Sequence, residues 1–347
     1  MLKIGILGCG RIAQTRHIPE YAANPACVLT GFYNPTASRA ADMAAKYGGR
    51  VYDTAQALIA DPEIDAVSVC SANYAHAALT IQALRAGKHV LCEKPMATTI
   101  ADCEAMVKAA GEAKRFLMIA QNQRLMPAHE AARRLLQAGE LGRVLSFRTC
   151  FGHGGPEQWS VTPGKGTWFF DKDKAAMGAM ADLGIHKTDL IQYLLGQRVV
   201  RTTARLTTLD KRGSDGELIG VDDNAVCIYE MQDGTIGTMS ASWTCYGGEE
   251  NATVIYGTQG VLHILEDPAH ALVLQKAGEA PRFIDPGQPR SGSGIIDLWV
   301  DCLLNGREPP ISGESVLSAM RAVFASIESS ETGRTVEIPE NRLPQER

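Results

Sequence analysis

The sequence lacks the features that mark a membrane-spanning, secreted or nucleic-acid-binding protein. It contains no run of about 18 uncharged apolar residues, the length at which a segment becomes a candidate for crossing a bilayer. Met1-Leu2-Lys3 leads directly into an apolar, strand-like segment that is too short for a signal peptide. The formal net charge is −5 and no dense run of Lys and Arg occurs, so there is no general basic field for nucleic acid. We therefore expect neither a membrane nor a nucleic acid among its partners.

Paired cysteines are missing as well. Nine cysteines are scattered through the chain, none forms a Cys-x-x-Cys pair, and their number is odd. Several lie inside apolar, strand-like runs, which favours free buried thiols over disulfides or a zinc site. The sequence therefore predicts a soluble, cytoplasmic protein.

The chain does contain enough apolar residues for a substantial core. With 347 residues, of which 45% are hydrophobic and 21% charged, it is expected to divide into two domains. The pattern of apolar runs changes after about Gln121. We therefore predict a first domain over residues 1–121 and a second over residues 122–347.

The first domain alternates short apolar runs with alanine-rich helical patterns. The runs expected to form strands are Ile4–Leu7, Val28–Tyr33, Arg50–Tyr52, Ala66–Cys70, His89–Cys92 and Phe116–Ala120. The clearest helical patterns are Ala37–Tyr47, Ala75–Ala86 and Ile100–Ala113. Gly87 is placed to end the second of these helices, and Thr98 or Thr99 to cap the third. Wholly apolar strands separated by helices are typical of α/β proteins with a doubly wound parallel sheet covered on both faces.

The second domain mixes helices with alternating strands and is predicted to be α+β. Its expected helices are Ala128–Gln137, Gly178–Leu195, Ile295–Leu304 and Ser315–Ser329, and a strand is expected over Arg143–Phe151. Asp233-Gly234 lies between two alternating runs, Val226–Met231 and Thr235–Thr244, which indicates a hairpin and hence an antiparallel, open sheet. The loop 152–176 is long, rich in Gly and Pro, and contains aromatic side chains, which favours a functional loop.

A glycine-rich turn follows the first predicted strand. Gly8-Cys9-Gly10-Arg11-Ile12-Ala13 fits the pattern G-x-G-x-x-G/A between a strand and a helical pattern. The first glycine permits a tight turn, the second lets backbone amides approach a pyrophosphate, and the small third residue lets helix and strand pack closely. The helix beginning near Arg11 would direct its N–H groups at the phosphates. Although such a turn can also be purely structural, its position in a βαβ unit favours dinucleotide binding.

The end of the second predicted strand is expected to select between NAD and NADP. An acidic residue there would bind the ribose hydroxyls and repel a 2′-phosphate, whereas an arginine would attract that phosphate. This chain has Asn34, which is uncharged, followed by Thr36, Ser38 and Arg39. The pattern leans toward NADP, although Arg39 could equally lie on a helix surface or stack on the adenine.

A lysine stands at the end of another predicted strand. Cys92-Glu93-Lys94-Pro95 follows His89–Leu91, and the ends of strands are where open α/β sheets present groups to ligands. Farther along, Asp182 and His186 are spaced i, i+4, so a helix would present both on one face. Each feature has a simpler explanation by itself, namely a surface lysine, a helix-capping aspartate and a buried histidine.

Taken together, these motifs resemble the Gfo/Idh/MocA oxidoreductase family (relatives of glucose–fructose oxidoreductase and inositol dehydrogenase). The matching stretches, in the order and spacing of the family, are Gly8–Ala13, Ala72-Asn73-Tyr74-Ala75-His76, Glu93-Lys94-Pro95, Gln123-Arg124 and Gly178…Asp182-Leu183-Gly184-Ile185-His186-Lys187-Thr188-Asp189. The resemblance covers nearly the whole chain. It implies an N-terminal Rossmann domain, and a C-terminal α+β domain whose large, mostly antiparallel sheet mediates formation of a homodimer or homotetramer. Asn34 departs from the acidic residue usual in the family, which puts strict dependence on NAD in doubt.

The resemblance also implies hydride transfer between NAD or NADP and a hydroxyl or carbonyl of a sugar, sugar derivative or cyclitol. Lys94, Asp182 and His186 would be the catalytic residues; which of Lys94 and His186 is the primary base stays open. The residues expected to bind the cofactor are Gly8, Gly10, Arg11, Ile12, Asn34, Arg39, Ser71, Asn73, His76, Glu93 and Lys94. The residues expected to bind the substrate are Arg124, His153, Trp168, Asp182, His186 and Tyr246.

Several alternatives remain at this stage. His76 or His153 could join His186 and a carboxylate as metal ligands, but hydride transfer to a nicotinamide needs no metal, so we expect none. A relative could also retain its cofactor for redox-neutral processing of a glycoside, or act as a cofactor-binding sensor without catalysis. The presence of Lys94, Asp182 and His186 together argues against the sensor, which needs no acid–base residues.

Overall fold

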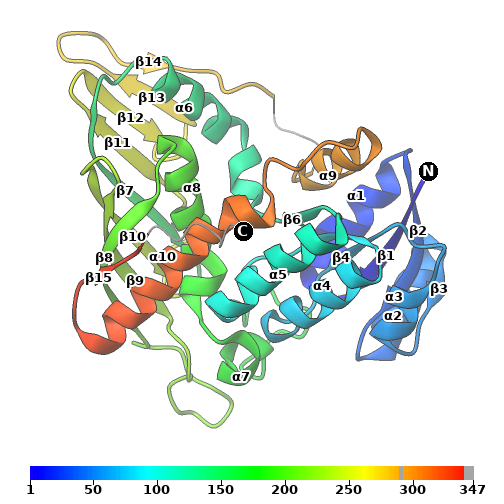
Figure 1. The fold of residues 1–347 in the computed structure, drawn as a ribbon. Coiled ribbons are helices and arrows are strands. Elements are labelled where there is room, and N and C mark those ends of the chain that lie inside the picture. The colour runs from blue at the N-terminus through cyan, green and yellow to red at the C-terminus, as the bar shows by residue number, and fades with distance from the viewer. Residues whose placement is uncertain (289–291, 340–347) are drawn as a thin grey trace.

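Two sheets organise the chain (Figure 1). The computed structural model describes residues 1–288 and 292–339, so residues 289–291 and 340–347 of the predicted second domain lie outside the described residues. The first sheet has six parallel strands in the order β3-β2-β1-β4-β5-β6. Its strands are β1 (Leu2–Leu7), β2 (Cys27–Tyr33), β3 (Arg50–Val51), β4 (Ala66–Val69), β5 (His89–Cys92) and β6 (Leu117–Ile119). This confirms the doubly wound parallel sheet, with strand ends shifted by at most two residues.

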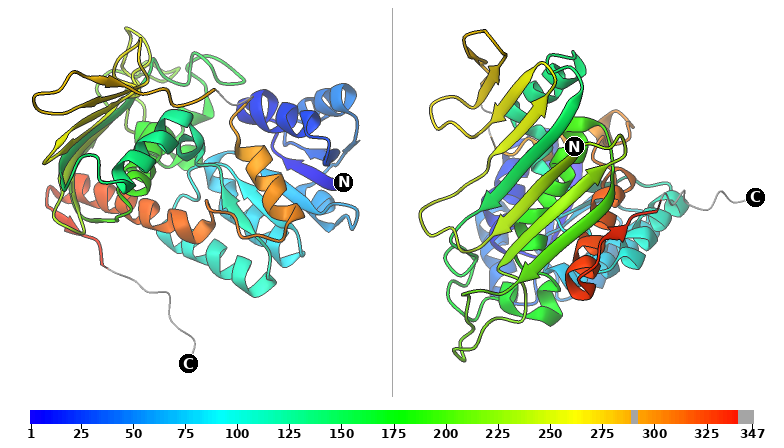
Figure 2. Two further views of the ribbon diagram at one scale, coloured as in Figure 1. Left: turned by 90° about the horizontal axis from the view of Figure 1, so that it is seen from above. Right: turned by 90° about the vertical axis from the view of Figure 1, so that its left-hand side faces the viewer.

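The helices between these strands lie on both faces of the first sheet (Figure 2). They are η1 (Ala13–His17), α1 (Ile18–Ala23), α2 (Ala37–Tyr47), α3 (Ala55–Ala60), η2 (Asn73–Ala75), α4 (His76–Arg85) and α5 (Ile100–Ala113). Their ends follow the expected signals: Gly87 has φ 82° just after α4, and Thr99 Oγ1 accepts the Asp102 N–H at 3.1 Å to cap α5. A sheet buried on both faces explains why its strands are apolar throughout.

The second sheet has nine strands in the order β14-β13-β12-β11-β7-β10-β9-β8-β15. They are β7 (Val144–Gly152), β8 (Val199–Thr207), β9 (Asn224–Met231), β10 (Ile236–Ser242), β11 (Thr253–Gly257), β12 (Gly260–Ile264), β13 (Leu272–Gln275), β14 (Arg282–Phe283) and β15 (Val336–Glu337). The predicted hairpin is present as the antiparallel pair β9–β10, with Gly234 at φ 86° in its turn. The pair β7–β10 is parallel and all the other pairs are antiparallel, so the sheet is mostly antiparallel as expected.

Helices cover only one face of this second sheet within the described residues, as the edge-on and face-on views of Figure 2 show. The remaining helical segments are η3 (Asn122–Leu125), α6 (Pro127–Gln137), η4 (Trp168–Phe170), α7 (Lys172–Ala175), η5 (Met180–Gly184), α8 (Ile185–Leu195), α9 (Ile295–Leu304) and α10 (Gly313–Thr332). The uncovered face exposes Val226, Ile228 and Ile236 to between 53% and 55%. No helix in the described part of the chain has the length and apolar character required to cross a membrane.

The C-terminal segment returns to the first half of the molecule. Helix α9 packs against α1, and α10 packs against both α5 and β8. The Ile119 N–H donates to the Ile311 carbonyl at 3.0 Å, so residues next to α10 extend the edge of the first sheet at β6. The division at residue 121 therefore stays a prediction, because later residues pack against both halves.

The predicted helix Gly178–Leu195 is divided into the π-helical turn η5 and the α-helix α8. The Asp222 carboxylate accepts the N–H groups of Gly178 and Met180, both at 2.7 Å, and thereby holds the start of this segment. A Cβ on Gly178 would lie 1.8 Å from the Asp222 carbonyl oxygen, so only glycine allows this approach. Asp182 consequently lies in a π turn, where the i, i+4 argument for an α-helix does not strictly apply.

Candidate active site

A cleft of about 810 Å³ lies where the carboxyl ends of strands in the first sheet meet η4, η5 and α8 from the second half. In open α/β sheets this edge is the usual position of a ligand. The structure brings most of the predicted residues together here: Gly8, Gly10, Arg11, Ile12, Asn34, Arg39, Ser71, Asn73, His76, Glu93, Lys94, His153, Trp168, Asp182 and His186 all line the cleft. The two predicted residues that do not line it are Arg124 and Tyr246.

The glycine turn has the close approach that its sequence predicts. Gly8 has φ 101°, and a Cβ there would lie 2.6 Å from the Cys70 carbonyl oxygen of the neighbouring strand. A Cβ built on Gly10 would have only the Cys70 carbonyl oxygen within 4 Å, at 3.9 Å, so the space beside Gly10 is open. Backbone amides at the start of the following helix therefore face a cavity without side chains in the way. This arrangement fits the pyrophosphate of a dinucleotide.

Asn34 supports the glycine turn from the end of β2. Its Oδ1 accepts the Cys9 N–H at 2.9 Å, and its Nδ2 donates to the Thr36 carbonyl at 3.0 Å. An aspartate could make the first of these hydrogen bonds but not the second, because it has no donor. Arg39 also lines the cleft, and its Nη2 donates to Thr162 Oγ1 at 2.8 Å in the long loop.

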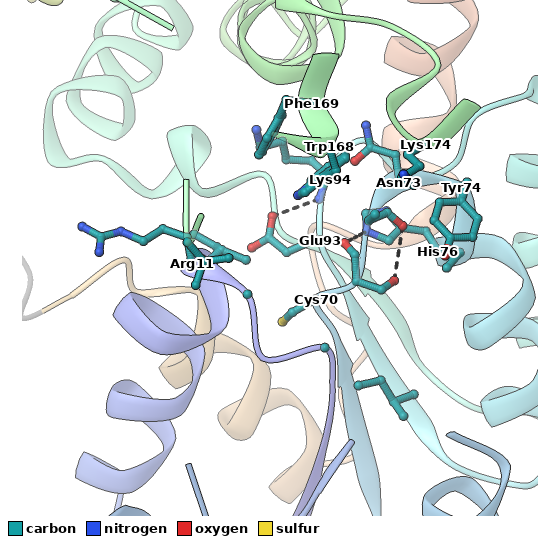
Figure 3. A pocket seen from close by; sticks show the side chains of 18 of the residues that line it. Arg11, Cys70, Asn73, Tyr74, His76, Glu93, Lys94, Trp168, Phe169 and Lys174 are labelled. Atoms are coloured by element: carbon teal, nitrogen blue, oxygen red, sulfur yellow. Dashed lines mark hydrogen bonds between the residues drawn. The ribbon is translucent and has the colours of Figure 1, made fainter. Parts of the chain in front are cut away.

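His76 joins the two backbone segments that border the cleft beside Lys94. Its ring nitrogens lie 2.8 Å from the Pro95 carbonyl and 3.0 Å from the Ser71 carbonyl, and the Lys94–Pro95 peptide bond is cis. Burial lowers the pKa of His76, against the opposing effect of these two carbonyls. Asn73 donates from Nδ2 to the Ala175 carbonyl at 2.9 Å, which ties η2 to α7 across the mouth of the cleft. His76 and Asn73 thus hold the walls of the cleft (Figure 3).

Lys94 and Asp182 form an ion pair across the cleft. The Lys94 ammonium donates to Asp182 Oδ1 at 2.9 Å and to the Asp182 backbone carbonyl at 2.8 Å. The Lys94 side chain is 18% exposed, so it reaches the cleft from a largely buried position. Because Asp182 lies in η5, this ion pair connects the two halves of the molecule within the cleft.

The Asp182 carboxylate has further donors on its other oxygen. Trp243 Nε1 donates to Asp182 Oδ2 at 3.0 Å, and His153 Nε2 lies 3.4 Å from the same atom. The Gly155 N–H donates to His153 Nδ1 at 3.0 Å, so that nitrogen is the acceptor and a neutral ring has its proton on Nε2, facing Asp182. Burial alone would raise the pKa of Asp182, but Lys94 and His153 outweigh it and hold the pKa well below its usual range. This low pKa favours the ionised form of Asp182.

His186 lies beside this pair and is neutral. Burial, followed by the nearby Lys94 charge, holds its pKa well below the ordinary value, against the opposing effects of Asp182 and Glu93. Its Nδ1 is buried without a hydrogen-bond partner among the described residues. A buried polar atom that lacks a partner is costly in a folded protein and is rare in native structures. A neutral imidazole at this position can accept a proton.

Aromatic side chains from the long loop form one wall of the cleft. Trp168 stacks on Phe169 with ring centroids 4.0 Å apart, and Trp159 packs edge-on against Phe169 at 5.1 Å. Figure 3 shows Trp168 and Phe169 above Lys94 and Glu93. The loop 152–176 thus reaches the cleft, in agreement with the expectation that it is functional.

Arg124 and Tyr246, by contrast, lie away from the cleft. Arg124 is buried and forms a two-pronged ion pair with Asp189, from Nε to Oδ2 at 2.7 Å and from Nη2 to Oδ1 at 2.5 Å. Tyr246 is 60% exposed, and its hydroxyl donates to the carboxylate of Asp210. The geometry therefore gives no support to substrate contact by either residue. Sequence alone could not separate them from cleft residues, because both are polar residues outside the regular apolar pattern.

Trp243 and His17 do not line the cleft but bind residues that do, and neither was predicted from the sequence. Trp243 lies just after β10 and is fully buried. The sequence feature that could have indicated it is a tryptophan directly after a predicted strand of mostly small and polar residues. His17 Nε2 lies 2.8 Å from Glu93 Oε1 beneath the cleft. No local sequence signal marks this contact, because His17 lies in a π-helical turn and Glu93 is 76 residues away.

The described residues contain no group of side chains typical of a metal site. Among residues 1–288 and 292–339, no three or more His, Cys, Asp and Glu side chains are grouped as a metal site. The ring nitrogens of His76, one of the residues considered, already lie against backbone carbonyls.

Comparison with known families identifies the chain. Residues 2–121 match the model of the oxidoreductase family with an NAD-binding Rossmann fold, and residues 129–263 match the GFO/IDH/MocA C-terminal domain. The chain belongs to the Gfo/Idh/MocA family of oxidoreductases, as its motifs indicated. Membership of this family supports a nicotinamide cofactor, whose role is to accept or donate a hydride.

Individual relatives extend over most of the chain. A levoglucosan dehydrogenase of Pseudarthrobacter phenanthrenivorans is 30% identical over 286 residues, covering 75% of this chain and 72% of the relative. A 1,5-anhydro-D-fructose reductase of Ensifer adhaerens is 27% identical, with 97% of this chain and 99% of the relative covered. The crystal structure of an aldose-aldose oxidoreductase from Caulobacter crescentus, complexed with glycerol, superposes with a TM-score of 0.84. It is 29% identical and covers 97% of this chain and 99% of that one.

Proposed function

We propose that this protein is a dehydrogenase or reductase that transfers a hydride between NAD or NADP and a CH–OH or carbonyl group of a sugar, sugar derivative or cyclitol. The observation that carries the proposal is the Lys94–Asp182 pair, which meets neutral His186 in the same cleft as the glycine turn. A hydride reaction on an alcohol needs an oriented hydroxyl and an acceptor for its proton. Both are available at this point of the cleft.

Each of these side chains has a definable task. The Lys94 ammonium, held by two oxygens of Asp182, can donate a hydrogen bond to the reacting oxygen of the substrate. The neutral ring of His186 can take up the hydroxyl proton during oxidation and return it during reduction. We infer that His186 is the primary base, because the Lys94 ammonium is already bonded to an ionised carboxylate.

The substrate class follows from the chemistry of the wall and from the names of the relatives. Trp168, His153 and Asp182 place a flat aromatic surface and hydrogen-bonding groups around the cleft, which suits a polyhydroxylated ring. The relatives reported above are named for their action on levoglucosan, 1,5-anhydro-D-fructose and aldoses. We therefore expect a small carbohydrate or cyclitol as the substrate.

The test is a turnover screen of sugars, cyclitols and their oxidised forms with both cofactors, followed by the absorbance of the reduced nicotinamide. Formation or consumption of reduced cofactor with at least one such compound supports the proposal. Tight cofactor binding without any such change for every compound would contradict it. A cofactor that cycles while remaining bound would instead indicate the redox-neutral alternative.

We further propose a preference for NADP over NAD. The support is the uncharged Asn34 at the end of β2 and the guanidinium of Arg39 on the cleft wall. Neither side chain would repel a 2′-phosphate. Measured KM values for the two cofactors test this, and a large preference for NAD would refute it.

Two further expectations accompany this function. The uncovered face of the second sheet, with the exposed side chains of Val226, Ile228 and Ile236, is proposed to associate with a second copy of the chain as a homodimer or homotetramer. Light scattering of the purified protein tests the oligomer, and a monomer at micromolar concentration would contradict it. A cytoplasmic location remains a prediction from the sequence.

A further inference from the structure

Beneath the cleft, four side chains from different elements form a buried chain of hydrogen bonds. The Tyr21 hydroxyl on α1 lies 2.9 Å from Ser68 Oγ on β4. Ser68 Oγ lies 3.2 Å from His17 Nδ1, and His17 Nε2 lies 2.8 Å from Glu93 Oε1. Tyr21 and Ser68 are fully buried, and His17 is 2% exposed. The chain therefore connects the interior of the first half to a carboxylate that lines the cleft.

His17 reaches Glu93 from an unusual place in its helix. It is the last residue of the π-helical turn η1, which follows directly on the glycine turn. Single π turns within helices are rare and are frequently found at functional sites. The helix that faces the phosphates of a dinucleotide thus also supplies the partner of Glu93.

Glu93 presents a negative charge to the cleft. Its Oε2 accepts the Lys94 backbone N–H at 3.1 Å, while its Oε1 faces His17. Burial alone would raise its pKa, but the hydrogen bond and charge of His17, with the charges of Lys94 and Arg16, lower the pKa to about 2. The Lys94 ammonium itself donates to Asp182, not to Glu93. Glu93 is therefore ionised, and neither of its carboxylate oxygens is bonded to the Lys94 ammonium.

The hydroxyl groups allow His17 to donate a hydrogen bond to Glu93. Tyr21 can donate to Ser68, and Ser68 can donate in turn to His17 Nδ1. With Nδ1 as the acceptor, His17 Nε2 donates to Glu93 Oε1. Each donor in this chain has one acceptor, so the Glu93 carboxylate is held in a fixed position at the wall of the cleft.

We propose that Glu93, positioned by His17, makes the site bind the oxidised, positively charged nicotinamide in preference to the reduced, neutral ring. This inference rests on the proposed function, since it assumes that a nicotinamide occupies the cleft beside Lys94. The physical reason is that a fixed charge in a buried, low-dielectric site interacts strongly with another charge and weakly with a neutral ring. His17 is a positioning residue in this scheme, because it acts on the cofactor only through Glu93.

The test compares the dissociation constants of NAD⁺ and NADH, and of NADP⁺ and NADPH, by fluorescence titration of the full-length protein. Glu93→Gln keeps the shape of the side chain and removes its charge. It should weaken binding of the oxidised form relative to the reduced form by about tenfold or more. His17→Leu should shift the ratio in the same direction, by about threefold or more, because the carboxylate loses its donor. His17→Gln, whose amide can donate to Glu93 and accept from Ser68, should restore the ratio of the wild type.

A matched control is His129→Leu, which removes another fully buried histidine that does not line the cleft. It is expected to lower the melting temperature without changing the ratio of the dissociation constants. An unchanged ratio in Glu93→Gln would overturn the inference. A shift in Glu93→Gln with none in His17→Leu would overturn the positioning role of His17. Failure of the wild type to bind any of the four nucleotides would instead refute the proposed function, so the two failures are distinguishable.

Discussion

The segment Met180–Leu195 forms two ion pairs with residues earlier in the chain, and the two pairs differ in exposure and chemistry. Lys94 and Asp182 meet in the cleft, with the lysine side chain 18% exposed. Arg124 and Asp189 meet away from the cleft, with the aspartate side chain 1% exposed. The first pair offers a donor to a ligand, whereas the second has both carboxylate oxygens engaged by one guanidinium.

This difference between the two ion pairs shows how two aspartates of one helical segment, Asp182 and Asp189, can have different roles. Arginine does not release its proton in proteins and binds a carboxylate with two parallel hydrogen bonds, which suits a permanent link between elements. Arg124 also lies 3.3 Å from the Ser315 carbonyl through Nη2, so it braces α10 as well. A lysine is a compact, mobile donor, and Lys94 keeps access to the cavity. We therefore expect loss of Lys94 to affect turnover and loss of Arg124 to affect folding.

The largest effect should come from Lys94→Ala. It should reduce kcat by about 10²-fold or more, the range of a general acid–base group, because the reacting oxygen loses its donor. Cofactor affinity should fall only modestly. Steady-state kinetics and nucleotide titration measure both quantities. Lys94→Arg serves as the control that keeps the charge, and it should remain impaired because a guanidinium differs in shape and reach; a kcat near that of the wild type in Lys94→Ala would refute the catalytic role.

Arg124→Ala should have the opposite effect, lowering stability and leaving turnover largely unchanged. It leaves Asp189 buried and unpaired, which is expected to cost about 3–5 kcal/mol in the free energy of unfolding. The fraction that folds should keep kcat within a few-fold of the wild type, since Arg124 does not line the cleft. Urea denaturation with kinetics at low temperature separates the two effects. A stable variant with strongly reduced kcat would show that the second pair takes part in catalysis.

Lys187 differs from Lys94 and Arg124, because no ion pair with a carboxylate is seen for it among the described residues. It is fully buried, and its ammonium has a long hydrogen bond to Thr253 Oγ1, at 3.4 Å, and lies 5.9 Å from the centroid of the Phe151 ring. Burial lowers its pKa to about 7, despite the opposing effects of Cys150, Glu249 and Glu250. Between this folded-state value and the ordinary value of about 10.4, the unfolded chain binds more protons, so the lysine makes stability rise with pH.

Lys187→Met should therefore stabilise the protein by about 2 kcal/mol near pH 7, because it removes the cost of burying a charge. The gain should shrink as the pH rises and should be lost only above about pH 10.4, where the wild-type lysine is neutral in both states. Denaturant melts of both proteins at several pH values measure the difference. An equal gain at every pH would show that packing rather than charge is responsible.

The smallest effect is expected at the exposed contact between Arg39 and Thr162, which also connects the two halves. Thr162→Val should change the free energy of unfolding by less than about 0.5 kcal/mol, as is usual for surface substitutions. Affinity for NADP⁺ should stay within about threefold. A larger loss of affinity, measured by titration, would reveal that the long loop helps to retain the cofactor.

Much of the first half was predictable because its signals are local. The strands β1 to β6 are short apolar runs bounded by helices, and the φ values of Gly8 and Gly87 match the turns that their positions suggested. The structure brings Lys94, Asp182 and His186, which a motif ties to their positions, into one cleft, and their roles stay predictions. Arg124 and Tyr246 do not line this cleft; a polar side chain in a loop or short helix gives no local sign of the direction in which it points.

The sequence by itself determined the family, the Rossmann half and the chemical character of the cleft, because glycine spacing and strand-end residues act through local backbone geometry. Only the tertiary structure decided which polar residues share the cleft. Asp182 binds Lys94, which follows β5, and Trp243, which follows β10; these residues are 88 and 61 positions away in the sequence. The link between His17 and Glu93 likewise spans 76 residues. Contacts of this kind depend on how two sheets and their helices pack, which no local pattern records.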